Sequence, residues 1–124
     1  MVQLKSVHPS ECELFRQMAE AYWQELMPHA DVVQDAERRT RYFQARFPFA
    51  DPNHRVQWAI IDEQPVGFVA FTLDQTHRQA MIEDFYVAPT ERRKGYGTGI
   101  VHLLYPQFDE LGIELVELNV RRDT

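Results

Sequence analysis

The chain has a single cysteine, Cys12, among its 124 residues. One cysteine cannot form a disulfide within the chain, and such sparse use of cysteine favours a reducing compartment. Long apolar runs are also missing, since none approaches the ~20 residues that a membrane span needs. The start, MVQLKSVHPSE, lacks the apolar core of a secretory signal. We therefore expect a cytoplasmic protein with no membrane partner.

Positive charge is scarce relative to negative charge. Thirteen Lys and Arg stand against nineteen Asp and Glu, which gives a net charge of −6. Nucleic acids are bound by basic faces, so no nucleic-acid partner is expected. The histidines are scattered along the chain without the spacing of metal ligands, so no metal site is expected either.

The apolar content is sufficient for one folded domain. Hydrophobic residues make up 44% of the chain and aromatic residues 12%, which is typical of a globular protein rather than a disordered one. A chain of this length can bury most of its apolar surface in a single core. No repeat, linker or low-complexity tract divides it, so we expect residues 1–124 to form one domain.

Hydrophobic periodicity predicts a mixed α/β fold with the order β-α-α-β-β-β-α-β. The first helix is expected to begin at a capping box of Ser10 and Glu13. The arginines of the second helix, Arg46 among them, are interpreted as a solvated face. Pro106 predicts a kink or an early end in the last helix. The expected elements are strands over 2–7, 56–61, 66–73, 81–87 and 114–120, and helices over 10–28, 31–46 and 97–111.

Glycine is scarce as well, but its distribution is informative. Three of the five glycines, Gly95, Gly97 and Gly99, alternate directly after the basic triplet at 92–94. They lie at the predicted start of a helix that follows a strand. A helix N-terminus presents unpaired N–H groups and the positive end of the helix dipole, and glycine lets the backbone wrap closely around an anion. This pattern predicts a phosphate-binding site.

Two common phosphate-binding motifs do not fit these residues. A P-loop requires a Lys and then a Ser or Thr after its glycines, and none follows here. The dinucleotide fingerprint G-x-G-x-x-G requires a third glycine where this chain has Ile100, and it begins directly after its strand, whereas residues 88–94 intervene here.

The segment instead resembles the acyl-CoA N-acyltransferase (GNAT) superfamily. Residues 92–97, RRKGYG, are similar to its pyrophosphate motif [QR]-x-x-G-x-[GA]; residues 85–89, FYVAP, resemble the strand end before that motif, and residues 62–69 resemble its hairpin. The resemblance implies a mixed, mostly antiparallel twisted sheet flanked by helices. It also implies direct transfer of an acetyl group from acetyl-CoA to an amine of a small molecule or to an exposed amino group.

The resemblance also implies roles for particular residues. The backbone N–H groups of residues 93–98 would bind the pyrophosphate with Arg92 close by, and the backbones of Phe85 and Val87 would pair with the pantetheine arm. A strand N–H near Phe85 would polarise the thioester carbonyl. The expected CoA-binding residues are Phe85, Tyr86, Val87, Arg92, Arg93, Lys94, Gly95, Tyr96, Gly97 and Thr98.

Transfer to an amine requires that the amine lose a proton, so a general base is expected. Glu83 is the first candidate, because period-two alternation places it on the same strand face as Phe85 and Val87. Asp84 is the second candidate and points to the other face unless a bulge intervenes. In the alternative interpretation, Glu83 only orients the substrate ammonium or lies solvated at an edge. Tyr22 is expected near the acceptor but is interpreted mainly as helix packing.

The sequence ends where the family normally continues with a helix and two further strands. No residue can therefore be assigned as the acid that protonates the departing thiolate. The resemblance predicts an open sheet edge, and we expect self-association as a homodimer because such edges invite pairing. Two alternatives stay open: a CoA-binding or interaction module with impaired catalysis, and a truncated fragment of a longer acetyltransferase.

Overall fold

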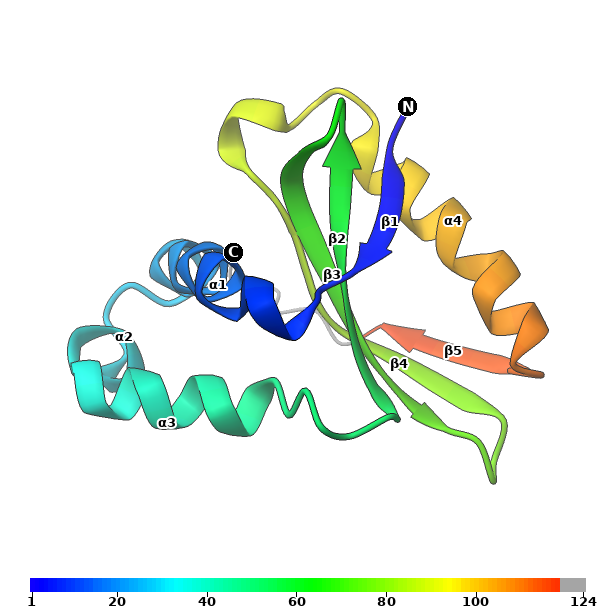
Figure 1. The fold of residues 1–124 in the computed structure, drawn as a ribbon, viewed down its shortest axis with the longest axis horizontal. Coiled ribbons are helices and arrows are strands. Elements are labelled where there is room, and N and C mark those ends of the chain that lie inside the picture. The colour runs from blue at the N-terminus through cyan, green and yellow to red at the C-terminus, as the bar shows by residue number, and fades with distance from the viewer. Residues whose placement is uncertain (119–124) are drawn as a thin grey trace.

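The protein is described by a computed structural model in which residues 1–118 are placed (Figure 1). Two short 3₁₀ helices, Pro9–Glu11 and Pro89–Glu91, precede longer helices. The predicted last strand is present, although its residues 119 and 120 lie outside the described part of the chain. The elements are β1 (Gln3–Ser6), α1 (Cys12–Leu26), α2 (Asp31–Gln34), α3 (Ala36–Arg46), β2 (His54–Ile61), β3 (Gln64–Asp74), β4 (Gln79–Val87), α4 (Tyr96–Glu110) and β5 (Leu115–Leu118).

The described strands form one sheet in the order β1-β2-β3-β4-β5. Neighbouring strands run antiparallel, except that β5 runs parallel to β4. The β2–β3 hairpin turns through Asp62 and Glu63, both at positive φ (49° and 66°), as a tight two-residue connection requires. The parallel pair needs a crossover, and α4 supplies it. The fold is therefore the mixed, mostly antiparallel sheet flanked by helices that the sequence predicts.

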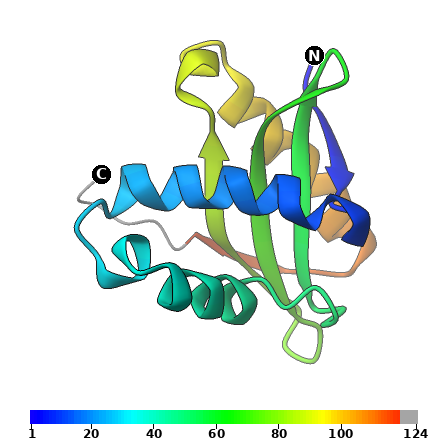
Figure 2. The ribbon, with the colours of Figure 1, turned by 60° about the vertical axis from the view of Figure 1, so that its left-hand side comes forward.

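Helices cover both faces of this sheet: α1 and α3 lie over one face and α4 over the other (Figures 1 and 2). Phe15 lies at the centre of the first layer, with its ring edge-on to Phe47 at 5.0 Å and to Phe68 at 4.9 Å. In the second layer Phe71 packs edge-on against Phe108 at 5.2 Å. The alternate residues of β3 enter opposite layers, so this central strand is covered on both sides.

The prediction of one helix over 31–46 is wrong, because the chain breaks at Asp35. This residue is extended (φ −106°, ψ 117°), and its carboxylate accepts hydrogen bonds from the N–H groups of Glu37 and Arg38. A short acidic side chain that caps the following turn competes with continued helix, and here the cap wins. The break separates α2 from α3 and leaves Arg46 as the last residue of α3.

Two further expectations about helix ends need correction. The capping box is formed by His8 and Glu11 rather than by Ser10 and Glu13, because Pro9 starts a 3₁₀ turn earlier in the chain. Of the two outcomes expected at Pro106, a kink or an early end, the early end does not occur, since α4 continues to Glu110. Leu104 and Phe108, both buried, anchor the helix on either side of the proline.

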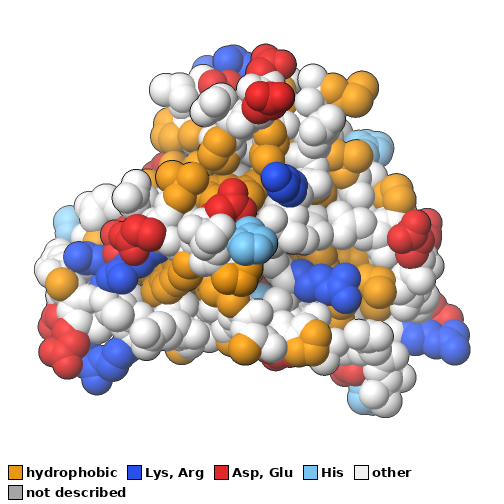
Figure 3. All heavy atoms as spheres, viewed as in Figure 1, with side chains coloured by type: hydrophobic (Ala, Val, Ile, Leu, Met, Phe, Trp, Pro, Cys, Tyr) orange, Lys and Arg blue, Asp and Glu red, His pale blue; other side chains and the backbone are white. Residues whose placement is uncertain are grey.

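The surface mixes charges of both signs. Figure 3 shows acidic and basic side chains interspersed on the face viewed, with hydrophobic side chains between them. None of the helices in residues 1–118 is long and apolar enough to cross a membrane.

Candidate active site

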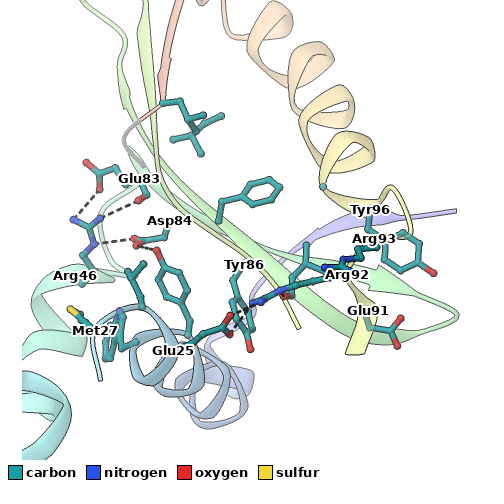
Figure 4. Close-up of a pocket in the computed structure, with 18 of the residues that line it drawn as sticks. Glu25, Met27, Arg46, Glu83, Asp84, Tyr86, Glu91, Arg92, Arg93 and Tyr96 are labelled. Carbon is teal, nitrogen blue, oxygen red and sulfur yellow. Dashed lines mark hydrogen bonds and ion pairs between the residues drawn. The ribbon is translucent and has the colours of Figure 1, made fainter. Parts of the chain in front are cut away.

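A cavity of about 570 Å³ lies at the carboxyl-terminal half of β4. Its walls come from α1, α3, β4, the start of α4 and Leu118 at the end of β5 (Figure 4). Lys94 and Thr98 are the two predicted residues that do not line it. The predicted residues that do are Glu83, Asp84, Phe85, Tyr86, Val87, Arg92, Arg93, Gly95, Tyr96 and Gly97.

One end of the cavity is formed by the segment 92–98, here called the glycine loop. Arg93 and Gly95 have positive φ values of 65° and 81°. Left-handed residues spaced in this way turn successive N–H groups toward one concave side, which is an anion-binding arrangement. Gly95 is the N-cap of α4 and has no side chain that could accept from the first turn of the helix. The loop therefore presents backbone N–H groups and a helix dipole to the cavity, which suits a phosphate.

Gly97 in this segment and Gly99 just after it differ in how much room a side chain would have. A Cβ atom at Gly97 would lie 3.6 Å from the ring of Phe85, an ordinary contact. A Cβ atom at Gly99 would lie only 2.7 Å from Cγ1 of Val2. Gly99 thus has a packing reason, the close approach of α4 to Val2, and it lies just beyond the glycine loop.

The three cations of the loop are in different surroundings. Arg92 donates two hydrogen bonds to the carboxylate of Glu25 and one, at 2.9 Å, to the carbonyl oxygen of Val87. Its hydrogen bonds to Glu25 raise the pKa of the guanidinium. Lys94 pairs with Glu91 at 3.0 Å. Within residues 1–118, Arg93 makes no ion pair, so its charge is the one in the triplet not already opposed by a carboxylate.

At the other end of the cavity, a bulge in β4 brings Glu83 and Asp84 to the same side. Ala70 pairs with Asp84 while the next residue, Phe71, pairs with Ile82, so Glu83 is the extra residue. Both carboxylates contact Arg46 on α3. The prediction that Glu83 shares a face with Phe85 and Val87 is therefore wrong, because the bulge interrupts the period-two alternation on which it depended.

The two carboxylates differ in burial and in partners. Asp84 is 5% exposed; Nε of Arg46 donates to its Oδ2 at 2.9 Å, and the hydroxyl of Tyr22 donates to its Oδ1 at 3.2 Å. Glu83 is 19% exposed and has looser contacts, at 3.7 Å to Nη1 of Arg46 and 3.5 Å to the hydroxyl of Thr72. Asp84 is thus a structural anion, and Glu83 is the carboxylate available to a ligand.

Arg46 is a site residue that sequence reasoning missed, because it was interpreted as part of a solvated face. It lies in the cavity wall beside Glu83 and Asp84 (Figure 4). Burial lowers its pKa, but the two carboxylates outweigh burial and the pKa is raised. No local signal marks this arginine, since its partners lie 37 and 38 residues later and meet it only through the packing of α3.

Tyr22 has a polar role in addition to packing. Its ring contacts Phe68 and Tyr86 edge-on, at 5.6 and 5.5 Å. Burial, and then the charge of Asp84, raise the pKa of its hydroxyl strongly. The hydroxyl therefore stays protonated at neutral pH and donates to Asp84. We use the name carboxylate cluster for Tyr22, Arg46, Glu83 and Asp84.

Between the two ends, the second half of β4 has no described strand beside it on one edge. β5 pairs with Gln79–Ile82 only, so in the part of the chain that the structure describes, Glu83–Val87 has no strand beside it on that edge. Exposed main-chain groups on a strand edge can pair with an added extended chain. Residues 1–118 contain no group of His, Cys, Asp and Glu side chains placed to hold a metal ion.

The chain is similar to known proteins in family and in fold. A family model described as the acetyltransferase (GNAT) family matches residues 13–124. No curated protein sequence matches the chain.

Several solved structures share the fold at low sequence identity. Ribosomal-protein-alanine N-acetyltransferase from Brucella melitensis biovar Abortus 2308 is 21% identical with a TM-score of 0.74, covering 98% of this chain and 82% of that chain. PaiA N-acetyltransferase from Thermoplasma acidophilum, in complex with coenzyme A, is 14% identical with a TM-score of 0.73, covering 98% and 80%. An aminoglycoside acetyltransferase from an uncultured soil metagenomic sample, in complex with sisomicin, is 16% identical with a TM-score of 0.69, covering 98% and 79%. These names differ in acceptor, so the shared fold does not specify one.

Proposed function

Because this chain belongs to the acetyltransferase (GNAT) family, we propose that it transfers an acetyl group from acetyl-CoA directly to an amine of a small molecule or to an exposed amino group. The observation that carries this proposal is that the glycine loop and the carboxylate cluster open onto one cavity. An anionic donor and a cationic acceptor can therefore meet at β4 (Figure 4).

The donor side fits acetyl-CoA in two respects. The left-handed backbone at Arg93 and Gly95 and the uncapped start of α4 suit a pyrophosphate. The unpaired edge of β4 suits an amide-containing arm that adds to the sheet like a strand. We propose that N–H groups of the glycine loop hold the pyrophosphate, with Arg93 nearby, and that the backbones of Phe85 and Val87 hold the pantetheine arm.

The reaction needs an unprotonated amine beside the thioester carbonyl. The amine nitrogen attacks the carbonyl carbon, the C–N bond forms, the C–S bond breaks, and CoA leaves as a thiolate that takes up a proton. The proton lost by the amine balances this uptake. We propose Glu83 as the base or first proton acceptor, because its carboxylate is partly exposed in the cavity and only loosely held.

A thiol-release assay tests the proposal. The full chain is incubated with acetyl-CoA and a panel of amines, and release of free CoA thiol is followed, with calorimetric titration of CoA in parallel. Release that depends on the amine is the expected result. CoA binding without release on any amine would contradict the enzymatic proposal and favour a CoA-binding module.

A further inference from the structure

We propose that the acceptor is a primary amine on an apolar stem with no carboxylate next to the reacting nitrogen. This inference rests on the proposed function and specifies its substrate class. It comes from the charge balance at the carboxylate cluster and from the side chains around that cluster.

The carboxylate cluster has more negative than positive charge. Glu83 and Asp84 contribute two carboxylates, and Arg46 contributes one guanidinium. Asp84 already receives the hydrogen bonds of Arg46 and Tyr22 and is almost fully buried. Glu83, with its loose contacts, is the carboxylate that a substrate ammonium can reach. The cluster therefore favours a cation.

Arg46 is not free to bind a substrate carboxylate. Its Nε donates to Asp84 and its Nη2 donates to the main-chain oxygen of Glu83 at 3.3 Å, while Nη1 faces the Glu83 side chain at 3.7 Å. A carboxylate brought to this guanidinium would lie beside two others, and like charges at such distances repel in a partly buried site. An amino acid would therefore be rejected at the same place where its decarboxylated counterpart is accepted.

Aromatic side chains line the same end of the cavity. Tyr22 contributes from α1 and Tyr42 from α3. Tyr86 on β4 lies next to Tyr22, with ring centroids 5.5 Å apart, and has the Arg92 guanidinium over its ring at 5.7 Å. Aromatic faces attract cations and bury apolar stems. The hydroxyl of Tyr22 is committed to Asp84, so this tyrosine offers its ring rather than its oxygen to the acceptor. The lining thus suits an aliphatic or aromatic stem on the amine.

The test compares three acceptors of matched shape: 2-phenylethylamine, phenylalaninamide and phenylalanine. The amide matches the acid in size but carries no negative charge, so it separates charge from bulk. We expect kcat/KM for the acid to be lower than for the amide by at least about tenfold. Equal values for acid and amide, with CoA still released, would overturn this inference and leave the proposed function intact.

Two variants locate the source of this preference. Glu83→Gln removes the net negative charge, so the acid-to-amide ratio of kcat/KM should rise at least about threefold toward unity, whatever happens to the overall rate. Glu13→Gln removes a carboxylate from the exposed start of α1, outside the cavity, and should leave the ratio unchanged. A ratio that is unchanged in Glu83→Gln would overturn the inference.

Binding measurements keep the inference testable apart from turnover. Each acceptor is titrated calorimetrically into the chain saturated with CoA. Binding of the amide and amine at concentrations where the acid does not bind supports the inference. Binding of the acid as tightly as the amide overturns it. Absence of CoA release with every amine, by contrast, would overturn the proposed function itself.

Discussion

At the scale of single residues, Glu83 and Asp84 are neighbours in the chain with different physical roles. Asp84 is buried and receives hydrogen bonds from Arg46 and Tyr22, so its charge holds α1, α3 and β4 together. Glu83 makes only long contacts and lines the cavity. Both side chains carry a carboxylate, so it is their burial and their hydrogen-bond partners that give Asp84 a structural role and leave Glu83 open to a ligand.

Asp84→Ala should destabilise the fold strongly. It would leave the Arg46 guanidinium in a partly buried site without its closest counter-charge, and such a loss costs about 3 kcal/mol. Urea unfolding followed by circular dichroism measures the change in free energy. A change under about 1 kcal/mol, the range of an exposed ion pair, would contradict the structural role of Asp84.

Glu83→Gln is the matched comparison, because it removes the adjacent charge without emptying a buried position. We expect a free energy of unfolding within about 1 kcal/mol of the parent chain and a fall in kcat of about 100-fold or more. The thiol-release assay and urea unfolding report these separately. Full activity in a folded Glu83→Gln chain would exclude the base role.

Gly97→Asp should weaken CoA binding by about tenfold or more, because a carboxylate in the first turn of α4 repels the pyrophosphate. Folding should tolerate the change, since a Cβ atom there only touches Phe85 and an acid suits a helix N-terminus. Calorimetric titration of CoA measures the effect. Gly97→Ala is the control: it adds the Cβ atom without charge and should retain most of the affinity. Equal affinities for the two variants would show that the phosphate is bound elsewhere.

At the scale of elements, local patterns predicted the strands, the β2–β3 hairpin and the glycine loop before α4. These features depend on residues close together in the sequence, such as the alternation in β4 and the spacing of Gly95 and Gly97. The break at Asp35 and the bulge at Glu83 were missed because each is a competition between two allowed local structures. Packing and capping decide such competitions, and periodicity does not represent them.

One member of the carboxylate cluster, Arg46, was missed for a different reason. Arg46 carries the same local signals as its exposed neighbours on α3, and only the packing of α3 near the β4 bulge gives it partners. Half of the cavity could therefore be predicted from one contiguous stretch, 83–98. The other half requires the positions of α1 and α3, which no motif encodes.

Protonation of His54, the first residue of β2, should make the free energy of unfolding depend on pH. Burial lowers the pKa of its imidazole below the ordinary value of 6.5, and its Nε2 has no hydrogen-bond partner among the described residues. Between the lowered pKa and 6.5 the unfolded chain binds more protons than the folded one. This contribution to stability is therefore present above pH 6.5 and lost as the pH falls below it.

Urea unfolding at a series of pH values measures this dependence. We expect His54→Gln to flatten the fall in stability below neutrality. His29→Gln, which changes an exposed histidine, should leave the slope as it is. An unchanged slope in His54→Gln would show that this histidine does not control acid sensitivity.

At the scale of the whole molecule, the fold places an excess of positive charge and an excess of negative charge at opposite ends of one cavity. The net charge of −6 does not reveal this separation. Basic side chains gather at the glycine loop, and the carboxylate cluster lies at the opposite end of the same cavity (Figure 4). β4 connects the two ends, because its bulge sets the acids and its last residues lead into the loop. On the proposed function, this one strand would orient the donor and the acceptor toward each other.

Self-association is the remaining expectation for the whole molecule. Among the described strands β5 is at the edge of the sheet, with Leu115 46% and Leu118 63% exposed. Unpaired strand edges with apolar side chains invite pairing with a second copy. Light scattering should therefore give twice the 14.7 kDa mass of the chain.

Leu115→Lys should shift the protein toward the monomer, because the charge would be buried in the paired edge. Leu103→Lys, at an exposed position on α4, is the control and should not change the mass. A monomer at all concentrations, or equal dissociation by both variants, would contradict pairing through β5.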